Sequence, residues 1–157
     1  MIKFKIVAVG KIKESYYKEA IAEYAKRIGR FASLEIVEVA ETLFNGIPNA
    51  KEIDKILESE GKRLQAACEG FVVLLDVGGK ALSSQSIADK ISQEMQRNGT
   101  FTFVIGGSYG TSEELKKSAA LRWSLSAVTL PHQLCRVVLA EQLYRICCIN
   151  GNVPYHK

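Results

Sequence analysis

Two short apolar runs, residues 71–75 and 101–105, constrain the fold of this chain more than any other feature. Each is too short for a typical helix and carries no charged residue. Such a run is typical of a strand buried on both faces, as in a parallel sheet that is covered by helices. A glycine-rich segment follows each run directly, at residues 76–80 and 106–110. We therefore expect a parallel sheet with glycine-rich loops at the ends of its strands.

The rest of the chain alternates between strand and helix patterns. Apolar residues recur at every second position in some segments and at helical spacing in others. This order indicates one α/β domain over residues 1–157 with a mostly parallel sheet. The expected strands are residues 2–9, 34–39, 71–75 and 101–105, with a fifth strand or extended segment at 123–130; the expected helices are residues 14–28, a helix capped by Asn49 that runs to about Ala67, one capped by Ser84, one opened by a capping box of Thr111 and Glu114, and residues 133–149.

The last expected helix, residues 133–149, is apolar almost all the way round its axis. A helix of this kind must be buried on every side, and a five-stranded domain has limited surface with which to bury it. Packing against the same helix of a second copy would cover the remainder, so we expect a C2 homodimer. The apolar positions are Leu134, Val137, Val138, Leu139, Leu143, Ile146 and Ile149.

Composition argues against several classes of protein. Lys3 and Lys5 interrupt the first apolar stretch, and no run reaches the roughly 18 uncharged apolar residues that a membrane span needs. The four cysteines contain no C-x-x-C pair, so we expect small buried thiols in a reducing compartment and no metal site. The expected protein is cytoplasmic and binds neither a membrane nor a metal. Its net charge of +4 permits a polyanionic partner without demanding one.

The two glycine-rich segments lie where parallel α/β sheets bind ligands, beyond the carboxyl ends of the strands. Glycine allows the backbone to approach a ligand closely, although tight turns between strand and helix would have the same pattern. Residues 78–80 lack the spacing of a phosphate-binding loop, and residues 106–110 read G-G-x-x-G rather than G-x-G-x-x-G. The pattern therefore disfavours dinucleotides and ATP as ligands.

Three residues near the last helix could carry acid–base or anion chemistry. His132 precedes the helix and is either a general base or an ordinary loop histidine. His156 is the penultimate residue and is either a general base or part of a frayed tail. Arg136 lies in the first turn of the helix, where its charge opposes the helix dipole. That placement suggests a bound anion or a partner carboxylate. Glu141 and Arg145 have the spacing of an ordinary helix-stabilising pair.

Four ordered stretches of the chain are similar to those of a known family. They are residues 103–110 (FVIGGSYG), 123–132 (WSLSAVTLPH), 136–145 (RVVLAEQLYR) and 154–157 (PYHK). Together with VAVGK at residues 7–11, they closely resemble the RlmH family. Its members are SPOUT-class methyltransferases that modify a pseudouridine of bacterial large-subunit ribosomal RNA. The resemblance covers essentially the whole chain.

The resemblance implies a fold and a cofactor that the residues alone do not. The fold would be an α/β trefoil knot, with the knot and an S-adenosylmethionine site in about residues 71–157, and the protein would be a homodimer. Apolar walls would hold the adenine while backbone groups read its edge. The matching cofactor positions are Leu75, Gly106, Leu125, Ser126, Ala127, Val128, Thr129 and Leu130.

The implied reaction is methyl transfer to N3 of a pseudouridine in 23S ribosomal RNA. The modest charge would not hold a long RNA, so the expected substrate is the assembled ribosome. N3 must lose a proton, and positioning with proton removal would supply most of the catalysis. The candidates on the substrate side are His132, Arg136 for phosphate or base contact, and Tyr155 and His156 as a tail that closes over the substrate. A transfer-RNA methyltransferase of the same class and a ribosome-associated RNA-binding protein with a vestigial cofactor pocket remain alternatives.

Overall fold

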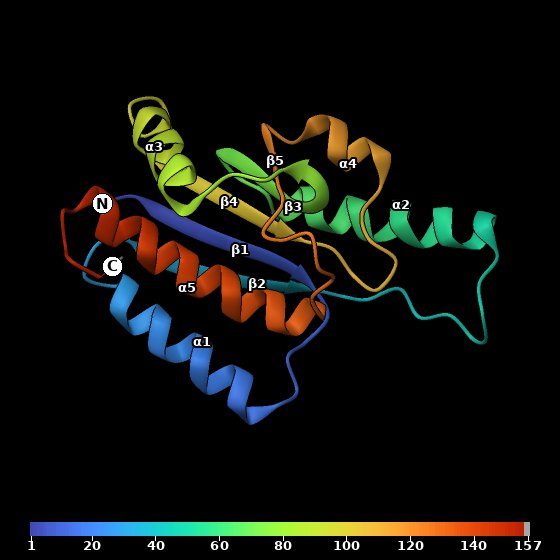
Figure 1. The fold of residues 1–157 in the computed structure, drawn as a ribbon. Helices are drawn as coiled ribbons and strands as arrows, with labels where there is room; N and C mark the ends of the chain where they lie inside the picture. The colour runs from blue at the N-terminus through green and yellow to red at the C-terminus, as the bar shows by residue number, and fades with distance from the viewer. Residues whose placement is uncertain (156–157) are drawn as a thin grey trace.

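All five strands of the sheet run parallel, as the sequence predicts, in the order β2-β1-β4-β3-β5 (Figure 1). The computed structural model describes residues 1–155. The strands are β1 (Lys3–Val9), β2 (Ser33–Val39), β3 (Phe71–Lys80), β4 (Thr100–Ile105) and β5 (Leu121–Trp123). The helices are α1 (Ser15–Ile28), α2 (Ala50–Ala67), α3 (Ser84–Glu94), α4 (Glu113–Ser118) and α5 (His132–Asn150). The predicted α/β class with a parallel sheet is confirmed.

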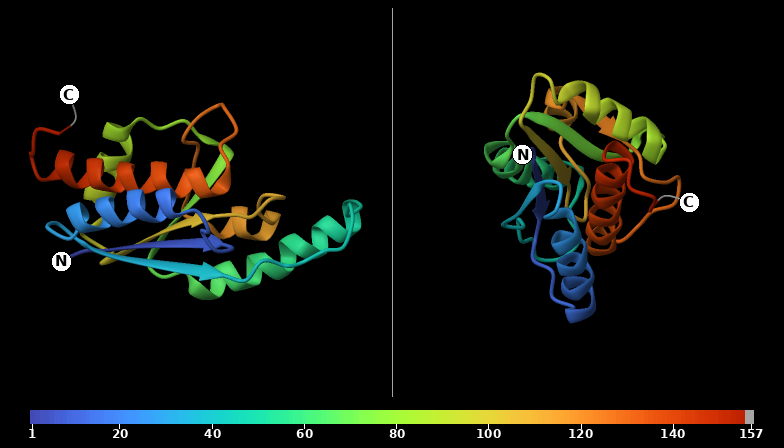
Figure 2. Two further views of the ribbon diagram at one scale, coloured as in Figure 1. Left: turned by 90° about the horizontal axis from the view of Figure 1, so that it is seen from below. Right: turned by 90° about the vertical axis from the view of Figure 1, so that its left-hand side faces the viewer.

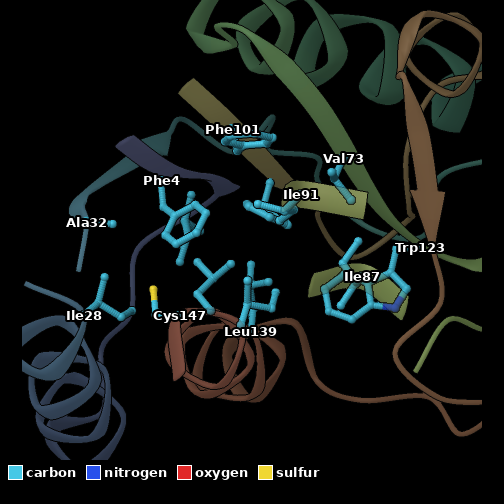
Figure 3. Packing of buried hydrophobic residues seen from close by; sticks show 14 of the residues in the cluster. Phe4, Ile28, Ala32, Val73, Ile87, Ile91, Phe101, Trp123, Leu139 and Cys147 are labelled. Carbon is cyan, nitrogen blue, oxygen red and sulfur yellow. The ribbon is translucent and has the colours of Figure 1, made fainter. Parts of the chain in front are cut away.

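Helices cover both faces of the sheet, and each face has its own apolar core. α5 packs between α1 and α3 on one face, whereas α2 and α4 cover the other (Figure 2). On the α5 face, Phe4 and Phe101 of neighbouring strands pack against side chains from α3 and α5 (Figure 3). On the opposite face, Val7 packs with Leu64 of α2 and Leu115 of α4. The central strands are therefore buried on both faces, which explains their apolar sequences.

One of three predicted helix N-caps is confirmed, and the other two differ from the prediction. Asn49 caps α2 and forms a reciprocal capping box, as predicted for that position. α3 is capped one residue earlier than predicted, by Ser83. Ser112 caps α4 by accepting a hydrogen bond from the third helical residue, so the predicted box of Thr111 and Glu114 is wrong. Adjacent hydroxyl residues have similar capping ability, so the sequence alone does not distinguish them.

One predicted boundary near the end of the sheet is wrong, because residues 76–80, expected as a loop, continue β3. For residues 123–130 the extended alternative holds, since β5 ends at Trp123 and residues 124–131 form a loop. A side chain on Gly79 would lie 2.6 Å from the carbonyl group of Arg122, so glycine lets the two backbones run this close. The amide of Ser124 then donates to the carbonyl of Lys80 (2.9 Å).

Candidate functional site

A cavity of about 790 Å³ opens at the carboxyl edge of the sheet, where β3, β4 and β5 end and α5 begins. Its volume falls in the range of small-molecule sites, roughly 300–1,000 Å³. Ala127 is exposed and is not among its lining residues. The other predicted cofactor positions do line the cavity; they are Leu75, Gly106, Leu125, Ser126, Val128, Thr129 and Leu130.

The loop after β4 brings bare backbone to the cavity. A side chain on Gly106 would lie 2.6 Å from both the carbonyl oxygen of Gly110 and the methyl group of Thr111. The amide of Gly110 donates to the carbonyl of Gly107 (3.1 Å), which closes the loop as a tight turn. Gly110 itself has a φ of +91°, a conformation that glycine adopts easily. Glycine at position 106 is thus required by the tight turn of the loop itself, one of the two interpretations that the sequence left open, and the same backbone lines the cavity.

An ion pair fixes the wall that β3 contributes. Asp76 lines the cavity and accepts hydrogen bonds from Nε and Nη2 of Arg122 on β5, at 2.8 and 2.6 Å. The amide of Gly78 donates to the same carboxylate (3.0 Å). Burial opposes ionisation of Asp76, but these bonds outweigh it and hold the pKa of the carboxyl below its usual value. Asp76 is therefore an ionised carboxylate that links β3 to β5. Its position directly after an apolar run is a signal that the sequence analysis missed.

The start of α5 forms the opposite side of the cavity, with His132 and Cys135 among its lining residues. Burial raises the pKa of the Cys135 thiol to about 11, even though the charge of Arg136 acts in the other direction. A thiol with this pKa is neutral at physiological pH and is a poor nucleophile. His132 is thus the candidate in this part of the wall for contact with a polar group of the ligand.

Arg136 lies behind this wall rather than on it. Its side chain is 2% exposed, and Nη1 donates to the carboxylate of Glu38 on β2 (2.7 Å). Nη2 donates to the carbonyls of Val9 and Gly10, at 2.8 and 2.7 Å, while Nε is buried and has no partner among residues 1–155. Of the two explanations that the sequence left open, the structure shows the partner carboxylate. Arg136 joins the ends of β1 and β2 to the start of α5 and does not line the cavity.

Tyr155 does not line the cavity of its own chain. It donates from its hydroxyl group to Glu141 (3.2 Å), and its ring packs on Tyr144 and under the guanidinium of Arg145. These three residues follow His132 by 9 to 13 positions, or roughly 14–20 Å along α5; Figure 1 shows the two ends of α5 on opposite sides of the domain. His156 lies outside the described residues.

Within residues 1–155, no cluster of three or more histidine, cysteine, aspartate or glutamate side chains could hold a metal ion. In the same part of the chain, no helix has both the length and the apolar composition for crossing a bilayer.

Comparisons with known proteins give one consistent result. A family model described as a predicted SPOUT methyltransferase matches residues 2–156. The chain is 43% identical over 159 residues to ribosomal RNA large subunit methyltransferase H of Streptococcus pneumoniae (strain CGSP14), and the match covers 99% of this chain and 100% of that protein. A solved structure of a probable methylase family protein from Haemophilus influenzae Rd KW20 is similar in fold. It has a TM-score of 0.55 at 10% identity and covers 99% of this chain and 70% of that one.

Proposed function

Because the chain belongs to the SPOUT methyltransferase family, we propose that it transfers the methyl group of S-adenosylmethionine to large-subunit ribosomal RNA. The observation that carries the proposal is the cavity, whose wall includes backbone at Gly106 where no side chain would fit. The curated relatives of the chain are named for methylation of large-subunit ribosomal RNA. We propose N3 of a pseudouridine on the assembled ribosome as the acceptor, and the cytoplasm as the location.

The residues of the cavity fit this cofactor. Apolar side chains, among them Leu75 and Leu125, suit the adenine ring, and the bare backbone at Gly106 suits recognition of its edge by amides and carbonyls. When bound, the cofactor supplies an electrophilic methyl group on a cationic sulfur. The side chains of the protein then need only orient the acceptor and exclude water.

Removal of the N3 proton is assigned to His132. It lines the cavity, and an imidazole can accept a proton near neutral pH. Cys135 and Tyr155 are poor alternatives, because the pKa of each group is raised above its usual value, mainly by burial, and each therefore stays protonated. Arg136 is assigned a supporting role at the base of the wall, since Nη1 and Nη2 are both bonded within the chain.

A homodimer would explain both the surface of α5 and the position of the tail. After α5 has packed between α1 and α3, Leu134, Val137 and Val138 are still half-buried apolar residues on its outer side. If two copies pack these surfaces together about a two-fold axis across the helices, the two α5 helices run antiparallel. Each C-terminal tail then lies near the cavity of the other copy, so the Tyr155 tail serves its partner rather than its own chain.

We expect the protein to sediment as a dimer of the 17.3 kDa chain at micromolar concentration. Complementation tests the exchange of tails. A Gly106→Ala chain has a damaged cavity, and a chain lacking residues 155–157 has no tail; each should be inactive alone. Co-expressed, they should regain activity through the mixed dimer, which pairs one intact cavity with one intact tail. If the mixture stays inactive while mixed dimers form, the tail does not act across the interface.

The function itself is tested by methyl transfer from labelled S-adenosylmethionine to purified ribosomes, isolated subunits and bulk transfer RNA. Mass spectrometry of nucleosides should find 3-methylpseudouridine in the large-subunit RNA alone. Methylation of transfer RNA instead would favour another activity of the same family. Binding to ribosomes without binding of the cofactor would favour an RNA-binding protein with a vestigial pocket.

A further inference from the structure

Glu60 on α2 is a buried carboxyl group with one oxygen that lacks a partner. Its side chain is 3% exposed. Oε2 accepts a hydrogen bond from the amide of Thr42 (2.9 Å), but Oε1 is buried and has no hydrogen-bond partner within the described residues. A polar atom left in this state costs free energy on folding. Such a group therefore needs an explanation beyond the stability of the fold.

The unpartnered oxygen lies directly behind the floor of the cavity. A side chain on Gly107 would lie 3.0 Å from Oε1 of Glu60, and Gly107 lines the cavity. Leu57, almost one helical turn earlier on α2, lines the cavity as well. Only the backbone of the glycine loop thus separates the Glu60 carboxyl from the ligand space.

The carboxylates that line the cavity already have cationic partners. Asp76 pairs with Arg122 at 2.6 Å, and Glu113 pairs with Lys116 at 3.3 Å. Glu60 takes part in no ion pair found between residues 1 and 155. It is consequently the acidic group at this site whose charge is available for a cation in the cavity.

Three charged groups face Glu60 from the elements around it. Burial is the main cause that raises the pKa of Glu60; Glu41 of the preceding loop raises it further, while Arg63 and His132 lower it. The guanidinium of Arg63 donates to the carbonyl of Ala40 and to the hydroxyl groups of Ser59 and Thr42, not to Glu60. Burial therefore disfavours the ionised form of this carboxyl, and a cation nearby would favour it.

We propose that Glu60 is the buried counter-charge for the cationic sulfur of the methyl donor. This inference rests on the proposed cofactor. Binding of S-adenosylmethionine favours the ionised carboxylate, and Glu60 releases its proton to solvent. The demethylated product, S-adenosylhomocysteine, carries no charge on sulfur, so the carboxyl takes a proton back from solvent. Glu60 thus helps the site to distinguish donor from product.

Calorimetry in buffers of different ionisation enthalpy, between pH 6 and 8, tests the proposal. Wild-type protein should release a fraction of a proton on binding S-adenosylmethionine and less on binding S-adenosylhomocysteine. Glu60→Gln keeps an oxygen that can accept the Thr42 hydrogen bond but removes the charge. It should lose this release, and its preference for donor over product should fall by about tenfold. Glu58→Gln is the matched control, because Glu58 is exposed on the same helix and pairs with Lys62.

His132 would also lose a proton beside a cation, so the same measurement is made with His132→Gln. Proton release that persists in His132→Gln and disappears in Glu60→Gln supports the proposal. Equal weakening of both ligands by Glu60→Gln would overturn it, because Glu60 would then support only the shape of the loop. Release that depends on His132 alone would also overturn it. If wild-type protein bound neither ligand, the cofactor assignment would fall first, and this inference with it.

Discussion

Arg136→Met should lower the free energy of unfolding by about 3 kcal/mol, the lower end of the cost of breaking a buried ion pair. The variant keeps an unbranched apolar stem but removes the guanidinium donors to the carbonyls of Val9 and Gly10 and to the Glu38 carboxylate, which then keeps only the amide of Ile12. We place the loss at the lower end because Glu38 is 34% exposed and can recover water. Urea unfolding followed by circular dichroism gives the measurement.

Arg27→Met is the matched control for this prediction. Arg27 pairs with Glu23 on the surface of α1, and both side chains are about half exposed (43% and 52%). An exposed helix pair is worth less than about 1 kcal/mol. A similar loss in the two variants would contradict the anchoring role of Arg136. The double variant with Glu38→Gln should recover part of the loss, since the uncompensated charge is then removed.

Gly106→Ala should weaken S-adenosylmethionine binding by at least about 100-fold while the protein stays folded. The added carbon would lie 2.6 Å from the carbonyl oxygen of Gly110, so the loop must move into or away from the cavity. A backbone shift of this kind removes several contacts with a ligand at once, and each 1.4 kcal/mol lost is about tenfold in affinity. Calorimetric titration measures the affinity, and thermal unfolding checks the fold.

Gly78→Ala provides the comparison for this variant. It lies in the other glycine-rich segment, and its added carbon would lie 3.4 Å from the Arg122 guanidinium and 3.6 Å from Asp76, which is ordinary contact. We expect affinity within a few-fold of wild type. Equal affinities of Gly106→Ala and wild type would show that the ligand does not approach this backbone.

Local patterns were sufficient to predict the parallel strands. Residues 71–75 and 101–105 are apolar because helices cover both sides of the sheet, and this requirement is visible in the sequence itself. The glycine at position 106 likewise indicates a crowded backbone, here the tight turn that the loop makes with Gly110 and Thr111. The order of the strands was not predictable in this way, because pairing depends on contacts between distant segments.

The partners of buried charged residues were also not predictable from the sequence. The sequence indicates that Arg136 needs an anion, but Glu38 lies 98 residues away, and several other acidic residues were equally eligible. Glu60 was missed as a candidate because nothing in the pattern of α2 distinguishes a buried glutamate from an exposed one. The extension of β3 through residues 76–80 was missed because glycine is usually a sign of a turn, whereas here it permits two backbones to lie close together.

The bonds from Arg136 to Val9 and Gly10 also set an order of assembly. They join groups 127 and 126 positions apart in the chain. During synthesis, the first strand is made long before the helix that supplies these donors, so its end remains hydrated until nearly the whole chain has been made. Contacts of such long range slow folding. The walls of the cofactor cavity include the start of the same helix, so the cavity is completed late. Binding of the ligand by a newly made chain therefore indicates that nearly the whole chain has folded.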